Sequence, residues 1–445
     1  MAADCITIIG GGLAGAEAAW QAARRGARVK LYEMRPEKLT PAHQTGLLAE
    51  LVCSNSLKGE GLGNGTGVLK EELRRLGSLI MRAADHHRVP SGQALAVDRD
   101  LFAGEITEAI EAEPSIELIR EEVTAVPDEG MVIIATGPLT SQALTRDLFK
   151  FTSEEYMFFY DAIAPIVSAE SINMEVAFKA DRYDKGEDEA AYINCPMDEA
   201  EYAGFYEALM SAEKTLHADY DPKELFEGCL PVEIIGSRGV DALRFGPMKP
   251  VGLKDPRTGR NPYAVVQLRP ENNELTMYNL VGFQTSLKYG EQKRVFSMVP
   301  GLENAEFLRY GAIHRNTFIN APTLLKPTFQ ARERDDLLFA GQITGVEGYV
   351  PSTASGWLAG VNAALMLQGK EPVALPPTTI IGALANYICT AEAKNFQPMN
   401  ANFGLLPPIE KKRGESRSQR REAQGKRCLE ALDAFIAGMP GLVVG

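Results

Sequence analysis

The sequence has few cysteines, and none of them stand at a spacing that metal or redox chemistry uses. The six cysteines lie at positions 5, 53, 195, 229, 389 and 428 and form no CxxC pair. No spacing of His, Cys and carboxylate residues suggests a metal site. These absences disfavour a zinc protein and a dithiol oxidoreductase. We therefore expect free thiols in a reducing compartment and no bound metal.

The chain also lacks targeting and membrane-spanning segments. Its first four residues carry no positive charge, and the apolar start is broken by glycines and then by Arg24 and Arg25. Neither a signal peptide nor a membrane helix fits this pattern, so we expect a cytoplasmic protein with no membrane contact. A chain of 445 residues is long enough for two or three domains with a sizeable core.

Positive charge is scarce overall but is concentrated near the C-terminus. A net charge of −13 argues against a protein that coats nucleic acid with its whole surface. From Lys411 to Arg427, however, there are 8 Lys or Arg residues against 2 Glu. Such a segment attracts phosphates locally, and we expect Arg417, Arg420 and Arg421 to bind RNA phosphates. A solvated helix face is the alternative.

A glycine-rich turn follows the apolar run Ile6–Ile9. Gly10, Gly12 and Gly15 form a GxGxxG pattern, and Glu33 ends the next apolar run. In a strand, turn, helix and strand of this kind, N–H groups at the helix N-terminus bind a pyrophosphate, because glycines leave no Cβ in its path. The acid then accepts hydrogen bonds from a ribose diol. A turn without ligand is the alternative, but the agreement of all parts predicts a bound dinucleotide.

Two later segments favour FAD over NAD. Met131–Gly137 reads as a buried strand that ends in small residues. Leu337–Gln342 repeats the pattern and leads through a glycine loop into an apolar helix from about residue 352 to 367. Together with the first turn, these segments resemble flavoproteins with two dinucleotide-binding segments. The resemblance implies cofactor contacts from Gly137, Gly341, Gln342 and Gly348.

The order of the segments indicates how the chain is divided. We expect a first part of the FAD-binding domain at 1–150, an insertion at 151–324, a second part at 325–375, and a helical C-terminal segment with the basic tail at 376–445. The expected fold is α/β: a Rossmann-like FAD-binding domain interrupted by a mixed α+β insertion domain, with a helical C-terminal tail. Residues 59–67 have glycine at every second position, which we interpret as a mobile loop over a ligand.

Four segments carry a closer resemblance: Glu50–Lys58, Phe226–Glu233, Arg244–Pro250 and Ala340–Tyr349. They are similar to the TrmFO family of folate- and FAD-dependent tRNA (uracil-5-)-methyltransferases, over essentially the full length. The resemblance implies methylation of C5 of uridine 54 in the T-loop of tRNA. It also implies 5,10-methylenetetrahydrofolate as one-carbon donor, FAD as methylene carrier and reductant, and NADPH or NADH as electron source. The implied partner is the T-arm of tRNA, with no obligatory protein partner.

Two cysteines are the catalytic candidates. C5 of uracil becomes nucleophilic when a thiolate adds to C6, and a thiolate is also a good leaving group. The resemblance places this nucleophile at Cys229, in a tight setting that we expect at a strand edge. It places Cys53 beside the flavin, where it assists catalysis. A buried structural cysteine is the alternative for Cys229.

His314 and Tyr349 are candidates to hold the folate pterin. Tyr349 belongs to the late glycine loop, and an aromatic ring there can stack on the pterin. For His314, a hydrogen-bonded structural role is an equally good interpretation. One departure from the family pattern is visible, because Gln44 stands where a second histidine is expected after His43.

Other functions remain as alternatives. A GidA-like flavoprotein that modifies wobble uridines shares the fold but normally carries a longer helical C-terminal domain. A non-catalytic, flavin-stabilised RNA-binding protein fits the basic tail equally well. Folate-dependent turnover separates the enzyme from the binding protein.

Overall fold

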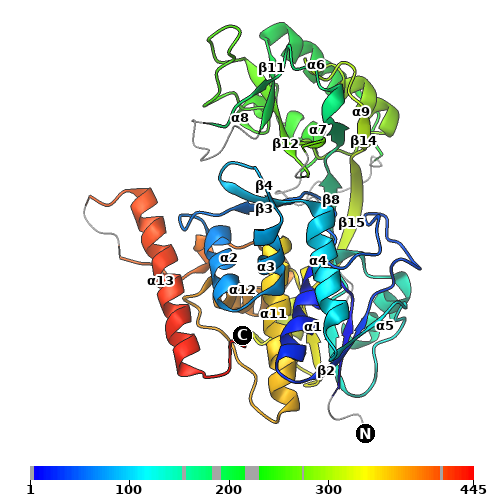
Figure 1. Cartoon of the computed structure of the whole chain (residues 1–445), viewed down its shortest axis with the longest axis vertical. Helices are drawn as coiled ribbons and strands as arrows, with labels where there is room; N and C mark the ends of the chain where they lie inside the picture. Colours follow the sequence, from blue (N-terminus) through cyan, green and yellow to red (C-terminus); the bar gives the residue numbers. More distant parts are fainter. Residues whose placement is uncertain are drawn as a thin grey trace.

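The computed structural model shows two lobes, each with its own hydrophobic core (Figure 1). One core gathers residues from 6 to 148 and from 318 to 442, and the other gathers residues from 167 to 305. The predicted fold class is confirmed, whereas the expected boundaries at residues 150, 324 and 375 stay predictions. The structure describes residues 5–152, 157–182, 192–215, 230–272, 275–410 and 414–444.

The first lobe is organised around a parallel sheet. One strand of this sheet, β7 (Met131–Ile134), is apolar and buried at every position, because a strand pairs with it on each side and helices cover its faces. In spatial order the strands are β16 (Leu337–Phe339), β7 (Met131–Ile134), β1 (Cys5–Ile9), β2 (Arg28–Tyr32) and β6 (Ile116–Ile119).

Helices surround this sheet. The two that lead away from the glycine turns pack directly on each other: an added Cβ at Gly356 or Gly360 would lie 2.2 or 2.4 Å from a carbonyl oxygen of the first helix. None of the described helices is long and apolar enough to cross a membrane. The helices are α1 (Leu13–Arg24), α2 (Gly65–Arg75), α3 (Leu79–His86), α4 (Arg99–Ala112), α5 (Gln142–Thr152), α10 (Ala321–Leu324), α11 (Tyr349–Leu367), α12 (Ile380–Thr390) and α13 (Arg417–Gly438).

The second lobe contains an antiparallel sheet with short helices beside it. In spatial order its strands are β10 (Phe178–Lys179), β11 (Ile193–Met197), β12 (Ala264–Pro270), β13 (Met277–Leu280), β9 (Ile166–Ser168) and β14 (Phe307–Arg309). The helices are α6 (Glu199–Ser211), α7 (Val232–Gly236), α8 (Ala242–Phe245) and α9 (Tyr289–Phe296). This mixture of strands and helices agrees with the predicted α+β insertion.

A two-stranded antiparallel ribbon links the lobes (Figure 1). It consists of β8 (Met157–Ile163) and β15 (Ala312–Phe318). A small sheet on the first lobe faces the second one and is formed by β3 (Ser56–Gly59), β5 (Ala94–Val97) and β4 (Arg88–Val89).

The interpretation of all of residues 59–67 as an irregular loop is wrong, because the segment begins in a strand and ends in a helix. Gly59 ends β3, and α2 begins at Gly65. Asn64 caps this helix, because its Oδ1 accepts the backbone N–H of Gly67 at 2.7 Å. A Cβ at Gly67 would lie 2.3 Å from two carbonyl oxygens, so this glycine serves close packing.

Glu72 of α2 makes stability depend on pH. Its carboxylate is fully buried and accepts the backbone N–H groups of Ile380 and Ile381 at 2.7 and 3.0 Å, at the start of α12. Burial raises its pKa from near 4.5 to about 8, although these two hydrogen bonds act in the opposite direction. The folded state therefore binds the proton more tightly than the unfolded state.

We expect this contribution to stability to be complete below pH 4.5 and to be lost as the pH rises through about 8. The loss reaches as much as about 5 kcal/mol. The check is Tm between pH 5 and 9 for the unaltered protein and Glu72→Gln, which has no carboxylate to titrate. Glu71→Gln, on the same helix but partly exposed, is the control. Equal pH slopes for Glu72→Gln and the unaltered protein would contradict the assignment.

Candidate functional site

Three neighbouring strands end at a cavity in the first lobe, whose volume is about 1020 Å³ when the space open to solvent is included. β1 leads into Gly10 and Gly12, β7 leads into Gly137, and β16 leads into Gly341 and Gln342, all of which line the cavity. The first turns of α1 and α11 line it as well. Ligands bind at the carboxyl ends of parallel strands, and helix N-termini favour anionic groups. The cavity therefore suits an elongated ligand that carries phosphates.

The three glycines of the first turn have different roles. A Cβ at Gly10 would lie 2.5 Å from the carbonyl oxygen of Ala135, and one at Gly15 would lie 1.7 Å from that of Gly10. Packing within the protein requires these two glycines. Gly12 is different, because its φ of −73° suits any residue and no atom lies within 4 Å of an added Cβ. A side chain at position 12 would therefore occupy space in the cavity and would contact no other part of the protein.

Glu33 lines the cavity, but its carboxylate is already engaged by the protein. Oε1 accepts the backbone N–H and the Nε of Arg35, both at 3.0 Å. Oε2 accepts the backbone N–H of Gly11 at 2.9 Å and Nη2 of Arg35 at 3.1 Å. Burial opposes ionisation, yet the contacts with Arg35 outweigh it and lower the pKa of Glu33. A ribose diol would have to replace contacts from Arg35, which the sequence analysis did not single out.

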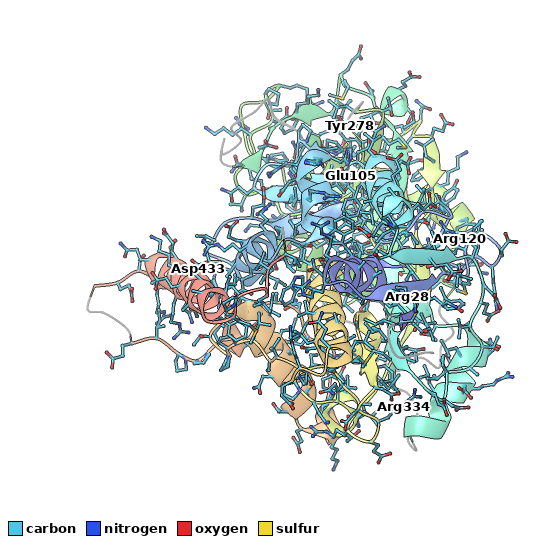
Figure 2. All side chains as sticks on the ribbon, turned by 60° about the horizontal axis from the view of Figure 1, so that its bottom comes forward. Arg28, Glu105, Arg120, Tyr278, Arg334 and Asp433 are labelled. Carbon is cyan, nitrogen blue, oxygen red and sulfur yellow. The ribbon has the colours of Figure 1, made fainter. Side chains whose placement is uncertain are left out.

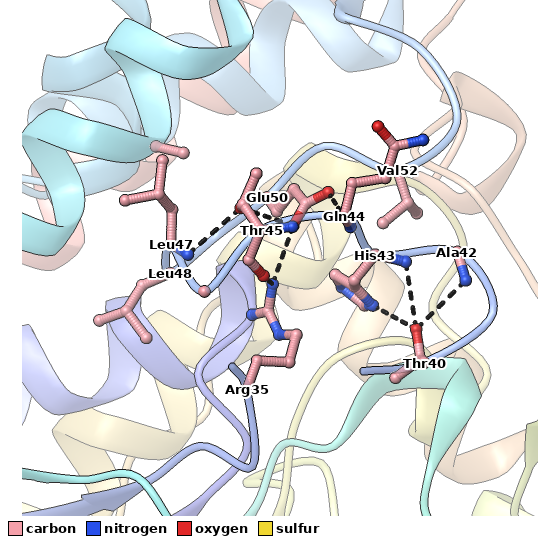
Figure 3. A network of polar contacts seen from close by, with 12 residues as sticks. Arg35, Thr40, Ala42, His43, Gln44, Thr45, Leu47, Leu48, Glu50 and Val52 are labelled. Atoms are coloured by element: carbon pink, nitrogen blue, oxygen red, sulfur yellow. Dashed lines mark hydrogen bonds and ion pairs between the residues drawn. The ribbon is translucent and has the colours of Figure 1, made fainter. Parts of the chain in front are cut away.

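A loop after β2 forms one wall of this cavity and is held by a polar network (Figure 3). Arg35 Nη1 donates to Glu50 Oε2 at 3.1 Å, and Glu50 also accepts the backbone N–H and the hydroxyl of Thr45 at 3.0 and 2.8 Å. Thr40 Oγ1 lies 2.6 Å from His43 Nδ1. His43 lines the cavity, so the network fixes the loop while leaving this ring at the wall.

Gln44, the departure from the family pattern, belongs to the same network. Its side chain is exposed, whereas its backbone N–H donates to Glu50 Oε1 at 2.8 Å (Figure 3). The contact uses the backbone, which any residue except proline supplies. The departure therefore does not alter how Glu50 holds the loop.

A second cavity adjoins the first, and its volume is about 1190 Å³ when the space open to solvent is included. Cys53, Lys58 and Gly348 line the second cavity and do not line the first. The adjoining region is marked by residues that line both cavities: Val52, Pro138, Leu139, Gln342 and Tyr349. A ligand in one cavity can thus approach a ligand in the other.

Tyr349 stands between the two cavities and contacts the segment of Cys53. Its hydroxyl accepts the backbone N–H groups of Cys53 and Ser54 at 2.8 and 3.2 Å. Burial raises the pKa of the phenol, and the nearby thiol acts in the same direction. Tyr349 is therefore neutral, and its hydroxyl fixes the backbone around the half-buried thiol of Cys53, which forms no disulfide.

Three arginines hold the loop 52–55, which carries Cys53. Arg309 Nη2 donates to a loop carbonyl oxygen at 2.8 Å, and Arg269 Nη2 donates to a loop hydroxyl at 2.6 Å. Arg99 Nη2 lies 3.5 Å from the carbonyl oxygen of Cys53. These contacts fix the thiol relative to both cavities, and the sequence analysis missed all three arginines.

Glu271 balances part of this positive charge. Its Oε2 lies 2.6 Å from Arg99 Nε. Burial is the largest single influence and lowers the pKa of Arg99, but the charge and hydrogen bond of Glu271, together with Tyr349 and Cys53, outweigh it, and the net pKa is raised. The pKa of Arg309 is lowered, mainly by burial and then by repulsion from Arg99. Because arginine has such a high ordinary pKa, both side chains are charged at neutral pH.

Two predicted site residues are placed only in part. Cys229 lies outside the described residues, so its expected place at a strand edge stays a prediction, and the next described element of the chain is α7, which begins at Val232. The backbone N–H of Val232 donates to the carbonyl oxygen of Gln284, which lines the second cavity, at 2.7 Å. His314 lies in β15, paired in register with Asp161 of β8, and its side chain is not among those described.

The predicted RNA-binding arginines lie on α13, away from both cavities. Ser416 begins the helix with a capping box. Arg75 of α2 pairs with Asp433 of α13, labelled in Figure 2, with Nη1 and Oδ2 2.6 Å apart. Arg421 is exposed and Arg420 is partly exposed. The helix is thus attached to the first lobe and leaves its first turns open to solvent.

The fold has counterparts among known proteins. The family described as glucose inhibited division protein A matches residues 5–371. The solved structure of Aquifex aeolicus GidA in its form II crystal is 19% identical and covers 97% of this chain and 73% of that chain, with a TM-score of 0.70. At this identity the likeness establishes the fold, which is that of the GidA-like class.

Closer relatives identify the family within this class. The methylenetetrahydrofolate–tRNA-(uracil-5-)-methyltransferase TrmFO of Pelotomaculum thermopropionicum is 60% identical over 98% of this chain and 99% of its own length. That of Heliobacterium modesticaldum is 60% identical over 97% of this chain and 98% of its own length. The chain belongs to the TrmFO family of methylenetetrahydrofolate–tRNA-(uracil-5-)-methyltransferases.

Proposed function

We propose that the protein methylates C5 of uridine 54 in the T-loop of tRNA, with 5,10-methylenetetrahydrofolate as one-carbon donor and NADPH or NADH as electron source. The observation that carries the proposal is the pair of adjoining cavities: the first has the features of a dinucleotide site, and the second exposes Cys53. Family membership supports the methyl donor and the substrate class.

The first cavity fits FAD. The open space beside Gly12 would accept the pyrophosphate, together with the N-terminus of α1. Glu33 would accept the ribose, and the far end would lie against Gly137, Gly341 and Gln342. When bound, FAD supplies transfer and reduction of the one-carbon unit. The residues that line the cavity would position the rings.

The second cavity is the proposed meeting point of folate and uracil. Tyr349, between the cavities, would stack on the folate pterin together with His314 from the linking ribbon. Cys229 would add its thiolate to uracil C6, which makes C5 nucleophilic, and would leave again when the C5 proton is lost. Cys53 would act beside the flavin, held by Tyr349.

The decisive assay combines the purified protein with unmodified tRNA, labelled methylenetetrahydrofolate and NADPH. We expect one labelled methyl group at C5 of uridine 54. Label at a wobble uridine would favour the GidA-like alternative. Binding of tRNA without any folate-dependent label would favour a non-catalytic RNA-binding protein.

Cys53→Ala should strongly reduce or abolish methylation while NADPH still reduces the flavin, provided that its step follows reduction. Flavin absorbance under anaerobic conditions measures the first reaction, and label transfer measures the second. Cys5→Ala, which removes another partly buried free thiol at the start of β1, is the control. Methylation by Cys53→Ala at the unaltered rate would mean that Cys53 is structural.

The basic start of α13 should contribute phosphate contacts. Changing Arg417, Arg420 and Arg421 to Ala should weaken tRNA binding and flatten its dependence on salt, with the log–log slope smaller by about 0.7 to 0.9 for each phosphate that is no longer bound. The measurement is tRNA affinity at several salt concentrations, with FAD content as a folding control. Superimposable salt plots for the variant and the unaltered protein would place the RNA elsewhere.

A further inference from the structure

An exposed phenylalanine stands in a basic segment of the second lobe. Phe245, the last residue of α8, is 80% exposed. Val240 and Val251 in the same segment are 52% and 46% exposed. Burying a phenylalanine side chain normally stabilises a protein by about 1.5 to 3 kcal/mol. An exposed phenylalanine with exposed apolar neighbours therefore indicates a surface that binds another molecule.

The backbone around this ring is firmly anchored. Leu243 and Met248, on either side of it, are fully buried. The guanidinium of Arg244 lies 3.6 Å from the centroid of the Tyr263 ring and 2.7 Å from an oxygen of Asp241. Phe245 is thus presented on a fixed turn, and an aromatic ring on a fixed turn loses little entropy when it binds.

The charge of the segment is opposite to that of the whole protein. Residues 237–260 contain six Lys or Arg residues and two Asp, in a chain of net charge −13. Both aspartates pair within the segment, with Arg244 and Arg257. Among the described residues, no carboxylate forms an ion pair with Lys249, Lys254 or Arg260, and all three are exposed. The segment therefore attracts polyanions.

The segment also lies close to the second cavity. The backbone N–H of Val265, near the start of β12, donates to the carbonyl oxygen of Met248 at 3.0 Å. Four residues further along the same strand, Arg269 lines that cavity and holds the loop of Cys53. Four residues of strand span about 13 Å. A polynucleotide on the segment would thus reach the cavity within a few nucleotides.

We propose that residues 237–260 bind tRNA beside the second cavity and that Phe245 stacks on an unpaired base next to the target. This inference rests on the proposed function, which makes tRNA the substrate. Exposed aromatic rings bind unpaired bases through their faces, and neighbouring Lys and Arg residues bind the phosphates. The apolar ring and the three exposed cations are then used by one ligand.

A tryptophan probe tests the stacking directly. The chain has two tryptophans, and Trp357 is fully buried, so Phe245→Trp adds a reporter that the unaltered protein lacks. We expect its fluorescence to be quenched when a T-arm hairpin of unmodified RNA is added. Equal fluorescence changes in Phe245→Trp and the unaltered protein, at saturating RNA, would overturn the proposal.

Affinity measurements give a second, independent test. Phe245→Ala should bind tRNA about 5- to 10-fold more weakly with the same FAD content and Tm. Tyr289→Ala is the matched control, because Tyr289 is 62% exposed but its ring already stacks on that of Tyr310, with ring centroids 5.2 Å apart. Changing Lys249, Lys254 and Arg260 to Ala should flatten the salt dependence.

The outcomes separate this inference from the proposed function. If the unaltered protein methylates tRNA but Phe245→Ala binds it equally well, the surface is wrong and the function stands. If the unaltered protein binds no tRNA, the proposed function itself fails. A change in oligomeric state in Phe245→Ala, with tRNA affinity unchanged, would show that the ring contacts protein and would overturn the inference.

Discussion

Cys229→Ala is expected to lower methyl transfer at least about 10³-fold, which corresponds to roughly 4 kcal/mol of lost transition-state stabilisation. Without a thiolate at C6, C5 of uracil is too weak a nucleophile to take the one-carbon unit. FAD content and reduction by NADPH should not change, because the first cavity is lined by other residues. Single-turnover label transfer measures the loss.

A 5-fluorouridine substrate sharpens the same prediction. Fluorine cannot leave C5 as a proton does, so the unaltered enzyme should remain covalently attached to the RNA. Cys229→Ala should form no adduct, whereas Cys389→Ala, which removes a buried thiol of the first lobe, should form it normally. Peptide mapping of the adduct to Cys53 or to another cysteine would contradict the assignment.

The sequence was sufficient to predict the lining of the first cavity because the patterns that indicate it are local. An apolar run, a glycine turn and a helix are neighbours in the chain, and parallel strands bring their carboxyl ends to one edge. Gly12, Gly137 and Gly341 therefore line one cavity, as expected from three separate patterns. The start of α2 was missed although the sequence marks it. Asn64 is a good N-cap residue, but the alternating glycines around it suggested a loop.

The surroundings of Glu33 were only partly predictable. Residues two apart in an extended chain point to the same side, so Arg35 could have been recognised as a partner of Glu33. By contrast, the support of Cys53 comes from α4, β12 and β14, in Arg99, Arg269 and Arg309. These side chains meet only through the tertiary fold, and no local pattern marks them.

The second lobe shows the same division between local and long-range information. Val265, Val266 and Leu268 lie in β12, a strand that is buried at every position. The sequence does not indicate what Arg269, later in the same strand, contacts. Its partner is a loop more than 200 positions earlier in the chain. Sequence patterns predict the elements, whereas the position of the thiol depends on how the two lobes meet.

Gly12→Val is expected to abolish retention of FAD. The backbone at Gly12 is extended and allows any residue, and no protein atom lies within 4 Å of an added Cβ. Nothing in the protein itself therefore requires glycine at this position. The requirement comes from the pyrophosphate, which should approach the N-terminus of α1 through the space that valine would fill.

Gly104→Val in α4 is the matched control, because an added Cβ there also meets no atom within 4 Å and the site is remote from the cavity. Both variants should fold with similar Tm when no flavin is present. Gly104→Val should purify yellow, whereas Gly12→Val should be colourless and should bind added FAD at least about tenfold more weakly, or about 1.4 kcal/mol. Full FAD occupancy in Gly12→Val would mean that the pyrophosphate passes elsewhere. Packing requires glycine at positions 10 and 15, so substitutions there could not distinguish a lost ligand interaction from a damaged fold. A substitution at Gly12 can make this distinction.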